Sequence, residues 1–418
     1  MRKLLVMVAM AVVCLFGASQ STIISHAKST WQVETPKEET QGGVTYYTYP
    51  NADGQTCWLY EIKAGENADI KTLTIPETIG GLTVTRLGTD IEDKNLFGEY
   101  AEWYHGGDGS NAFTKRVKQI QFPETITEID KNCFCGFDSM TSVKLPSRVT
   151  KISDHLFYDC DSLQSIILPE AMEELDVSAF SQCDKLNNIV IPEQNVKYIS
   201  SKKSVMSKDG KTLYFVYSND KTYKIPASVT LVKKYAFYYG CRAKKVEISK
   251  NVKELEQRAL QSYKIKNVTV SRKNPHFKKD GQSIYRTSDR SLAVAIAPKG
   301  RKYVMSDKVR KLTINVSVIG SIDPEEMHAG LILREVILSK KLKYIEKNCV
   351  FGNDLSGYPF VTVDIIQFQT AKPPKCKDKH ALPLSAKIRV PKKSAKAYKK
   401  VYKKYKRWKH VKDNWSEY

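Results

Sequence analysis

The sequence predicts a β-rich solenoid, in which parallel strands stack in coils of about 23 residues, with β-hairpin insertions and a C-terminal capping helix. Three observations predict this fold: a phrase repeated at a fixed interval, a strand signal that ends each repeat, and an apolar helical stripe near the C-terminus. The chain has 418 residues, 41% of them hydrophobic and 27% charged, which is typical of a globular protein with a sizeable core.

The repeated phrase is clearest in the first half of the chain. "LFYDCDSLQSIILP" at 156–169 is preceded 23 residues earlier by "CFCGFDSMTSVKLP" and followed 23 residues later by "AFSQCDKLNNIVIP". A unit of this length cannot bury its apolar face alone, whereas stacked units can. The repeat therefore predicts a stack in which each coil contacts mainly its neighbours.

One half of each repeat is a short strand signal that alternates outward and apolar positions. A period of two predicts a strand, and Pro ends it because Pro cannot donate to the ladder. The signals that end in Pro are TLTIP (72–76), QIQFP (119–123), SVKLP (142–146), SIILP (165–169) and NIVIP (188–192). Those that end in Ser are KVEIS (245–249), NVTVS (267–271) and EVILS (335–339). Stacked in parallel, they form one continuous core.

The other half is an apolar pair, three residues apart, before an aromatic or apolar anchor. The pairs with their anchors are Ile126/Ile129 with Phe134, Val149/Ile152 with Phe157, Met172/Leu175 with Phe180, Val229/Val232 with Phe237, Val252/Leu255 with Leu260, and Leu342/Ile345 with Val350. Pairs without an anchor are Val84/Leu87, Val196/Ile199 and Val309/Leu312. Cys160 and Cys183 hold the same place in successive repeats, which predicts small buried hydrophobes rather than metal ligands.

Two insertions interrupt the rhythm. "KDGKTLYF" at 208–215 matches "KDGQSIYR" at 279–286, and Asp-Gly between apolar segments is typical of a hairpin turn. We therefore expect repeats over 114–371 with hairpin insertions near 200–226 and 272–306.

The N-terminal residues 1–27 are typical of a secretory signal peptide. Arg2 and Lys3 precede an apolar run at 4–18, and "SHA" at 25–27 offers a cleavage site. A lipoprotein signal acylated at Cys14 and a retained anchor are the alternatives. No later apolar run approaches the length of a membrane span, so none is expected after signal removal. The signal predicts a secreted, extracellular chain, with cell-surface association as a further option.

The next segments lead into the repeats. Residues 28–43 are polar and predict a flexible leader. Residues 44–88 predict an N-terminal cap and first coil, whose aromatic runs "VTYYTYP" and "CWLYEI" cover the open end of the core. Residues 89–113 predict an inserted loop with Tyr100, Trp103 and Tyr104 as candidate binding residues. Local packing of these aromatics is the somewhat favoured alternative.

Residues 372–418 predict a basic C-terminal cap. The formal net charge of the chain is +22, and residues 372–412 hold 17 Lys or Arg and one acid, Asp378. An apolar stripe predicts one face of a helix within 394–411, made of Tyr398, Val401, Tyr402, Tyr405 and Trp408. We expect this stripe to pack on the last coil, with the lysines as its solvated face. That face also suits a polyanion, and the candidate residues are Lys396, Lys399, Lys400, Lys403, Lys404, Lys406 and Arg407.

The repeat also resembles a known family. The pattern C-x-x-L-x-x-I-x-L-P-x-x-V-x-x-I-x-x-x-A-F, carried by 160–169 with Met172, Leu175, Ala179 and Phe180, resembles the BspA-like leucine-rich repeats of bacterial secreted and cell-surface proteins. The resemblance covers roughly 70–410, and the segment 386–400 resembles the family's terminal cap. Phe137 stands where Cys is expected, Cys241 is shifted by one residue, and the repeats after Cys349 are eroded. The resemblance implies a leucine-rich-repeat solenoid and adhesion to host proteins or other cells.

No catalytic motif accompanies the repeats. The sequence has no Gly-x-Ser-x-Gly, no His-Glu-x-x-His and no phosphate-binding loop, which predicts a protein that is not an enzyme and uses no cofactor and no metal. We expect a binding protein whose partner is a host or cell-surface protein or glycan, bound in part through Gln121, Lys144, Ile167 and Val190, which face outward on their strands. The alternatives are retention on an anionic wall polymer or glycan through the basic segment, and an enzyme with its site in the insertions. Nucleic acid is not expected as the partner of an exported chain.

Overall fold

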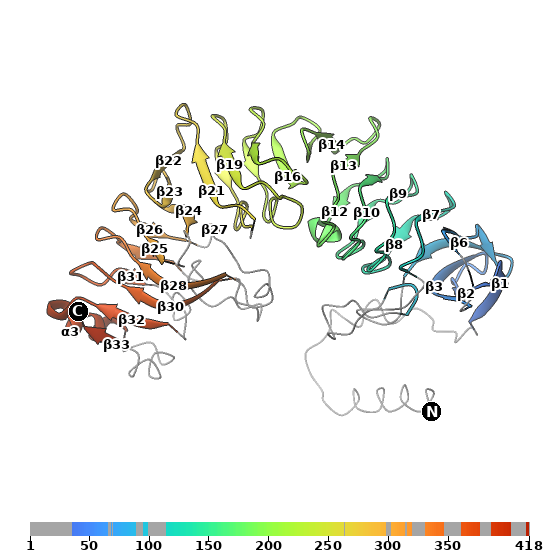
Figure 1. Cartoon of the computed structure of the whole chain (residues 1–418), viewed down its shortest axis with the longest axis horizontal. Helices are drawn as coiled ribbons and strands as arrows, with labels where there is room; N and C mark the ends of the chain where they lie inside the picture. Colours follow the sequence, from blue (N-terminus) through green and yellow to red (C-terminus); the bar gives the residue numbers. More distant parts are fainter. Residues whose placement is uncertain are drawn as a thin grey trace, which may run out of the picture.

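The computed structural model describes most of the chain between residues 36 and 417. The described residues are 36–65, 68, 70–88, 95–98, 114–262, 264–297, 302–313, 316–319, 331–346, 361–376, 386–402 and 415–417. Their strands follow an arc from β1 (Lys37–Gln41) at one end to the helix α3 (Ala395–Tyr402) at the other (Figure 1). This architecture confirms the predicted β-rich solenoid with a C-terminal helix.

A first series of parallel strands contains the predicted strand signals together with further strands that those signals did not include. Before the first insertion they are β4 (Thr72–Thr74), β7 (Gln119–Gln121), β9 (Ser142–Lys144), β11 (Ser165–Ile167) and β13 (Asn188–Val190). Between the insertions they are β17 (Thr222–Lys224), β19 (Lys245–Ile248) and β21 (Asn267–Val270). After the second they are β25 (Lys302–Val304), β28 (Leu331–Ile337), β30 (Val361–Gln367), β32 (Lys387–Val390) and β33 (Trp415–Glu417). Val143, Ile166 and Ile189 are direct neighbours in β9, β11 and β13, so the register advances by one repeat per strand.

A second series of short parallel strands contains the second residue of most of the apolar pairs. Its members are β6 (Leu82–Leu87), β8 (Glu128–Ile129), β10 (Lys151–Ile152), β12 (Glu174–Leu175), β18 (Leu231–Val232), β20 (Glu254–Leu255), β26 (Lys311–Leu312), β29 (Tyr344–Ile345) and β31 (Lys375–Cys376). A 3-10 helix over Val177–Phe180 follows β12. In Figure 1, β8, β10 and β12 lie on the inner side of the arc, and β7, β9 and β13 lie on its outer side.

The aromatic anchors stack from coil to coil inside the core. Phe134, Phe157 and Phe180 are fully buried, and their ring centroids are 5.7 and 6.3 Å apart in succession. Each repeat thus supplies the same ring at the same depth, and burial of such rings dominates the energetics of a core.

The repeated cysteines satisfy carbonyl groups of the preceding coil. The Cys160 thiol donates to the Phe134 carbonyl oxygen at 3.2 Å, and the Cys183 thiol donates to the Phe157 carbonyl oxygen at 3.0 Å. A small apolar side chain with a weak donor suits this place. Within the described part of the chain, every cysteine is a buried free thiol.

Each insertion is an antiparallel meander of three strands. The first consists of β14 (Tyr198–Ser201), β15 (Ser204–Ser207) and β16 (Thr212–Val216), and the second of β22 (Phe277–Asp280), β23 (Ser283–Arg286) and β24 (Leu292–Ile296). The last strand of each returns to the parallel stack, because β16 pairs with β18 and β24 pairs with β27 (Ser317–Ile319).

The expected match between the two Asp-Gly segments is wrong. Gly210 lies in the turn between β15 and β16, whereas Gly281 lies in the turn between β22 and β23. Both glycines have positive φ, so the turn chemistry was read correctly. The register shifts at Val205/Met206 and at Ile284/Tyr285 align the meanders instead, with β15 equivalent to β23. In the first meander Val196 is also 83% exposed, so the predicted pair Val196/Ile199 is not a core pair.

The meanders divide the apolar interior into three clusters. In the first meander, Phe215 packs into the cluster on its N-terminal side, and Leu213 packs into the cluster on its C-terminal side. In the second, Val294 and Ala295 face opposite clusters in the same way. Each meander is therefore a wall with two apolar faces rather than a loop on the outside of one coil.

The N-terminal cap is a mixed sheet in the order β1-β2-β3-β6-β5, which adds β2 (Val44–Pro50), β3 (Thr56–Ala64) and β5 (Thr78–Ile79). Part of the expected flexible leader forms β1, which pairs with β2, and the Glu39 carboxylate accepts from the Gly80 N–H at 2.7 Å. Tyr46 is buried, as expected of a cap. Tyr49, Trp58 and Tyr60 are half-buried and stack on one another instead of covering the core.

The C-terminal cap combines a helix with a strand. Tyr398 of α3 is fully buried against Phe368, and its hydroxyl donates to the Thr370 carbonyl oxygen at 2.9 Å. The preceding residues Lys392–Ser394 form a 3-10 helix. The sequence did not predict β33, which pairs in parallel with β32. Of the expected helix over 394–411, residues 403–411 lie outside the described part of the chain.

Candidate functional site

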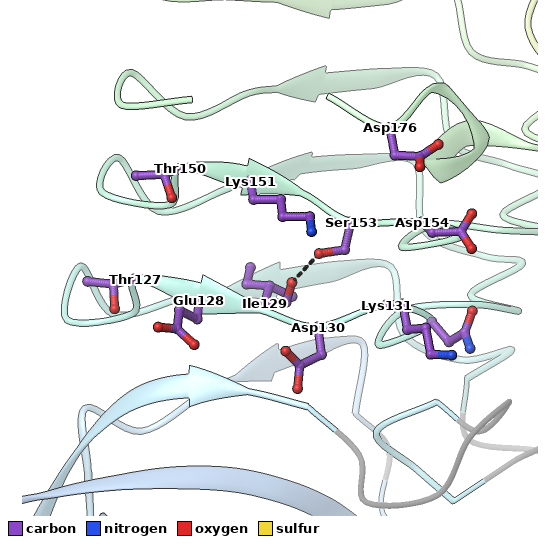
Figure 2. A pocket seen from close by; sticks show the side chains of 11 residues that line it. Thr127, Glu128, Ile129, Asp130, Lys131, Thr150, Lys151, Ser153, Asp154 and Asp176 are labelled. Carbon is purple, nitrogen blue, oxygen red and sulfur yellow. Dashed lines mark hydrogen bonds between the residues drawn. The ribbon is translucent and has the colours of Figure 1, made fainter. Parts of the chain in front are cut away.

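A polar cleft of about 690 Å³ opens on the second strand series of the first cluster. Figure 2 shows its lining side chains coming from consecutive coils. They are Thr127, Glu128, Ile129, Asp130, Lys131, Asn132, Thr150, Lys151, Ser153, Asp154 and Asp176. The cleft therefore lies on the inner side of the arc, where β8, β10 and β12 run (Figure 1).

The acidic side chains of the cleft follow the short strands at nearly equivalent positions. Asp130 follows β8, Asp154 comes two residues after β10, and Asp176 follows β12. The main chain repeats here too, because the Asp130 N–H donates to the Leu87 carbonyl and the Asp176 N–H donates to the Ile152 carbonyl. Sequence reasoning missed this row, although the signal was an acid after the apolar pair in "EID", "KISD" and "ELD".

Asp130 is held by an arginine from the N-terminal cap. Its carboxylate accepts from Nη2 and Nε of Arg86 at 2.7 and 3.2 Å. The same guanidinium lies 4.9 Å from the centre of the Trp58 ring, within the range of a cation–π contact. Gly88 allows this packing, because a Cβ there would lie 2.1 Å from Asp130 Oδ2.

Asp154 and Asp176 share a second group of contacts. His155 Nδ1 lies 2.7 Å from Asp154, and the Ser178 hydroxyl bridges Asp154 to Asp176. The hydrogen bond from His155 is the main cause that holds the pKa of the Asp154 carboxyl below its ordinary value, although partial burial opposes it. Asp176 also caps the 3-10 helix through the Ser178 N–H.

These three carboxylates thus have partners inside the chain and support the local fold. The chemistry that the cleft offers is hydrogen bonding along a row of polar groups. Among the described residues, no group of three or more His, Cys, Asp or Glu could hold a metal ion. No helix in that part of the chain is long and apolar enough to span a membrane.

The predicted outward residues lie on the first strand series. Ile167 is half-buried and pairs directly with Val190, which is 39% exposed, and with Lys144 on its other side. Gln121 is exposed on β7. The same column carries a second apolar pair, Val304 and Ile337, in which Val304 is 43% exposed.

The basic candidates divide at the end of α3. Lys396, Lys399 and Lys400 are exposed on the helix, while Tyr398 and Ala395 face the core. The other predicted polyanion-binding residues, Lys403, Lys404, Lys406 and Arg407, lie outside the described residues. The same is true of the loop candidates Tyr100, Trp103 and Tyr104, and of the predicted signal peptide.

Comparison with known proteins adds the following findings. A family model described as BspA type leucine rich repeat region matches residues 109–206 and 210–293, with six copies. A search of curated proteins found no match.

Several solved structures resemble the chain. The pneumococcal vaccine antigen PcpA is 16% identical, with a TM-score of 0.42 over 91% of this chain and 97% of that chain. A leucine rich cell surface protein from Faecalibacterium prausnitzii A2-165 is 16% identical, with a TM-score of 0.38 over 88% and 93%. A leucine-rich repeat protein from Eubacterium ventriosum ATCC 27560 is 15% identical, with a TM-score of 0.39 over 81% and 96%.

The family model thus covers the coils with the stacked anchors Phe134, Phe157 and Phe180 and the parallel strands β9, β11 and β13. Residues 109–206 and 210–293 therefore carry BspA-type leucine-rich repeats.

Proposed function

We propose that the protein is a secreted, surface-exposed binding protein that uses its solenoid to bind a macromolecular partner and catalyses no reaction. The repeat family, the predicted signal peptide and the extended polar faces of the stack support this proposal. A solenoid presents a long surface on which residues from successive coils stand in rows, which suits a protein or glycan better than a small substrate.

The observation that carries the proposal is the apolar pair Ile167 and Val190 in the outward column. Outward positions of a strand are normally polar, and here two apolar side chains from adjacent coils stand side by side. Lys144 flanks them on the next coil. An apolar centre with a polar edge is the usual composition of a protein-binding surface.

The test is binding of the mature chain to an array of extracellular-matrix proteins and glycans at two salt concentrations. Replacing Ile167 and Val190 by Asp should abolish capture of the protein ligands that the native chain retains. The matched control replaces Thr74 and Thr269 by Asp, which adds the same charge in the same column. Unchanged capture by the Ile167→Asp, Val190→Asp variant refutes this surface.

A second candidate function is retention on an anionic wall polymer or glycan through the basic C-terminal segment. The supporting observation is that α3 buries Tyr398 and exposes lysines on its other side. Truncation is a poor test because it removes Tyr398 from the core. Reversing Lys396, Lys399, Lys403 and Lys406 to Glu should release the protein from cell walls, with a steep loss at high salt in the native chain. Retention equal to that of the native chain refutes this function.

A further inference from the structure

A second basic surface lies far from the C-terminal segment, on the strands between the two meanders. Four lysines, here named the lysine ladder, stand at the start of β17, β19 and β21: Lys221, Lys244, Lys245 and Lys266. All four are exposed. They contribute nothing to the core, so packing does not explain why lysine recurs at this place in successive coils.

The main chain holds the ladder in register. The Lys244 N–H donates to the Lys221 carbonyl oxygen at 3.1 Å, and the Lys266 N–H donates to the Lys244 carbonyl oxygen at 2.8 Å. Adjacent parallel strands are about 4.8 Å apart, so each of the three coils carries at least one ladder lysine at this spacing along the stack.

No acidic side chain in the described part of the chain forms an ion pair with the ladder. The nearest acids have other partners: Glu247 lies 3.4 Å from Lys224, and Asp220 accepts from the Ser218 hydroxyl at 3.1 Å. Burial and then the charge of Lys245 lower the pKa of Lys279, whose Nζ donates to Asn267 Oδ1 at 2.8 Å. Lys279 of the second meander therefore lies near Lys245 of the ladder.

The fold itself does not require these charges. In the preceding cluster of coils, the same main-chain ladder joins Lys71, Lys118, Thr141, Gln164 and Asn187, and the last three of these equivalent positions carry no charge. Like charges directly opposite each other in a sheet destabilise it. An uninterrupted run of lysines over three coils costs stability, and three successive coils of the preceding cluster do without it, so it is expected at a functional site.

We propose that the lysine ladder binds a linear sulfated polysaccharide that runs along the stack, with anionic groups over successive coils. Lysine supplies a compact charge with three donors, which suits sulfate and carboxylate groups. Exposed Thr222 and Asn267 on the same strands offer hydroxyl and amide groups for sugar hydroxyls. This ligand class distinguishes the ladder from the apolar pair Ile167 and Val190, and the two sites can fail independently.

The test is binding of the full mature chain to immobilised heparin across a salt series, with Lys396, Lys399, Lys403 and Lys406 reversed to Glu in every protein compared, so that the C-terminal segment does not bind heparin. Replacing the four ladder lysines by Gln should weaken binding at least about tenfold at 0.1 M salt, where exposed charges act over about 10 Å. The slope of log affinity against log salt should fall by roughly one per lysine removed. The thermal midpoint should stay equal or rise, because like charges have been removed.

The matched control replaces four exposed lysines outside the ladder by Gln: Lys250, Lys253, Lys273 and Lys308. This control should bind heparin as the native chain does, and desulfated heparin should not bind the native chain. Native-like binding by the ladder variant overturns the proposal, as does equal loss in the control. Ladder-dependent binding of polyphosphate that matches heparin in affinity overturns the assignment to a polysaccharide.

Discussion

At the scale of single residues, burial decides the chemistry of the cysteines. Loss of water around the thiol raises the pKa of Cys57 to about 11 and that of Cys241 to about 12. The thiolate is the reactive form, so these side chains behave as small apolar groups. This explains how a chain with several cysteines keeps them as free thiols in the described coils.

Alkylation tests this directly. We expect Cys57 and Cys241 to stay unmodified when the folded protein is incubated with iodoacetamide at pH 8.5, because the raised pKa and the burial both suppress the thiolate. In guanidinium chloride the same residues should be fully modified, as read from peptide mass spectra. Similar rates of modification in both conditions contradict the buried thiols.

The contact between His155 and Asp154 predicts a contribution to stability that depends on pH. The folded pKa of Asp154 lies below its unfolded value of about 3.9, so the contribution is present above that value. It is lost as the pH falls through the folded pKa. Asp154→Asn should therefore lower the melting temperature at pH 7 and have a smaller effect at pH 3. The control Asp161→Asn, at an exposed position, should change neither value.

At the scale of elements, the meanders differ from the insertions usual in repeat proteins because the last strand of each packs into two apolar clusters. The strand β24 is buried at every position, which a strand on the outside of a coil is not. The last strand of each meander contacts both neighbouring clusters. It also separates them, so that their other side chains do not contact one another across it.

Two substitutions in β16 test the wall. Phe215→Ala removes a side chain from the first cluster and should cost about 3–5 kcal/mol, and Leu213→Ala removes one from the second and should cost about 2–5 kcal/mol. Hydrogen exchange should accelerate around Phe180 in the first variant and around Val232 in the second. The same exchange pattern in both variants contradicts a two-faced wall.

At the scale of the whole molecule, three apolar clusters in a row predict unfolding in stages. Stability in a stack is close to a sum over neighbours, and long repeat arrays depart from two-state behaviour. The cap at each end then stabilises against unfolding only the cluster on which it packs.

Two distant substitutions examine this prediction. Phe157→Ala lies in the first cluster and Tyr398→Ala in the last, and each should cost about 3–5 kcal/mol in its own cluster. In urea, each variant should shift a different transition, monitored by hydrogen exchange and mass spectrometry. Tyr398→Phe, which removes only the hydroxyl that donates to Thr370, should shift the last transition by about 1 kcal/mol. A single transition shifted equally by both alanine variants refutes staged unfolding.

Much of this architecture could be predicted from the sequence. The spacing of the repeats is visible in the sequence itself, and it determines which residues of neighbouring strands pair. The 23-residue spacing predicted the neighbours Val143, Ile166 and Ile189, and the anchors predicted the stacked rings. The pairing of the meanders could not be predicted, because an Asp-Gly turn fits either hairpin. The cleft and the lysine ladder were missed since each depends on side chains that meet only across coils.

The constant register of β9, β11 and β13 has a consequence for the length of the molecule. Because Ser142, Ser165 and Asn188 are equivalent neighbours, loss or gain of one 23-residue coil leaves every remaining strand with a partner of the same kind. The distance between the N-terminal cap and the first wall can therefore change in steps of about 4.8 Å without a new fold. Duplication in the gene is thus a simple route by which such a protein adjusts its reach to a partner of different size.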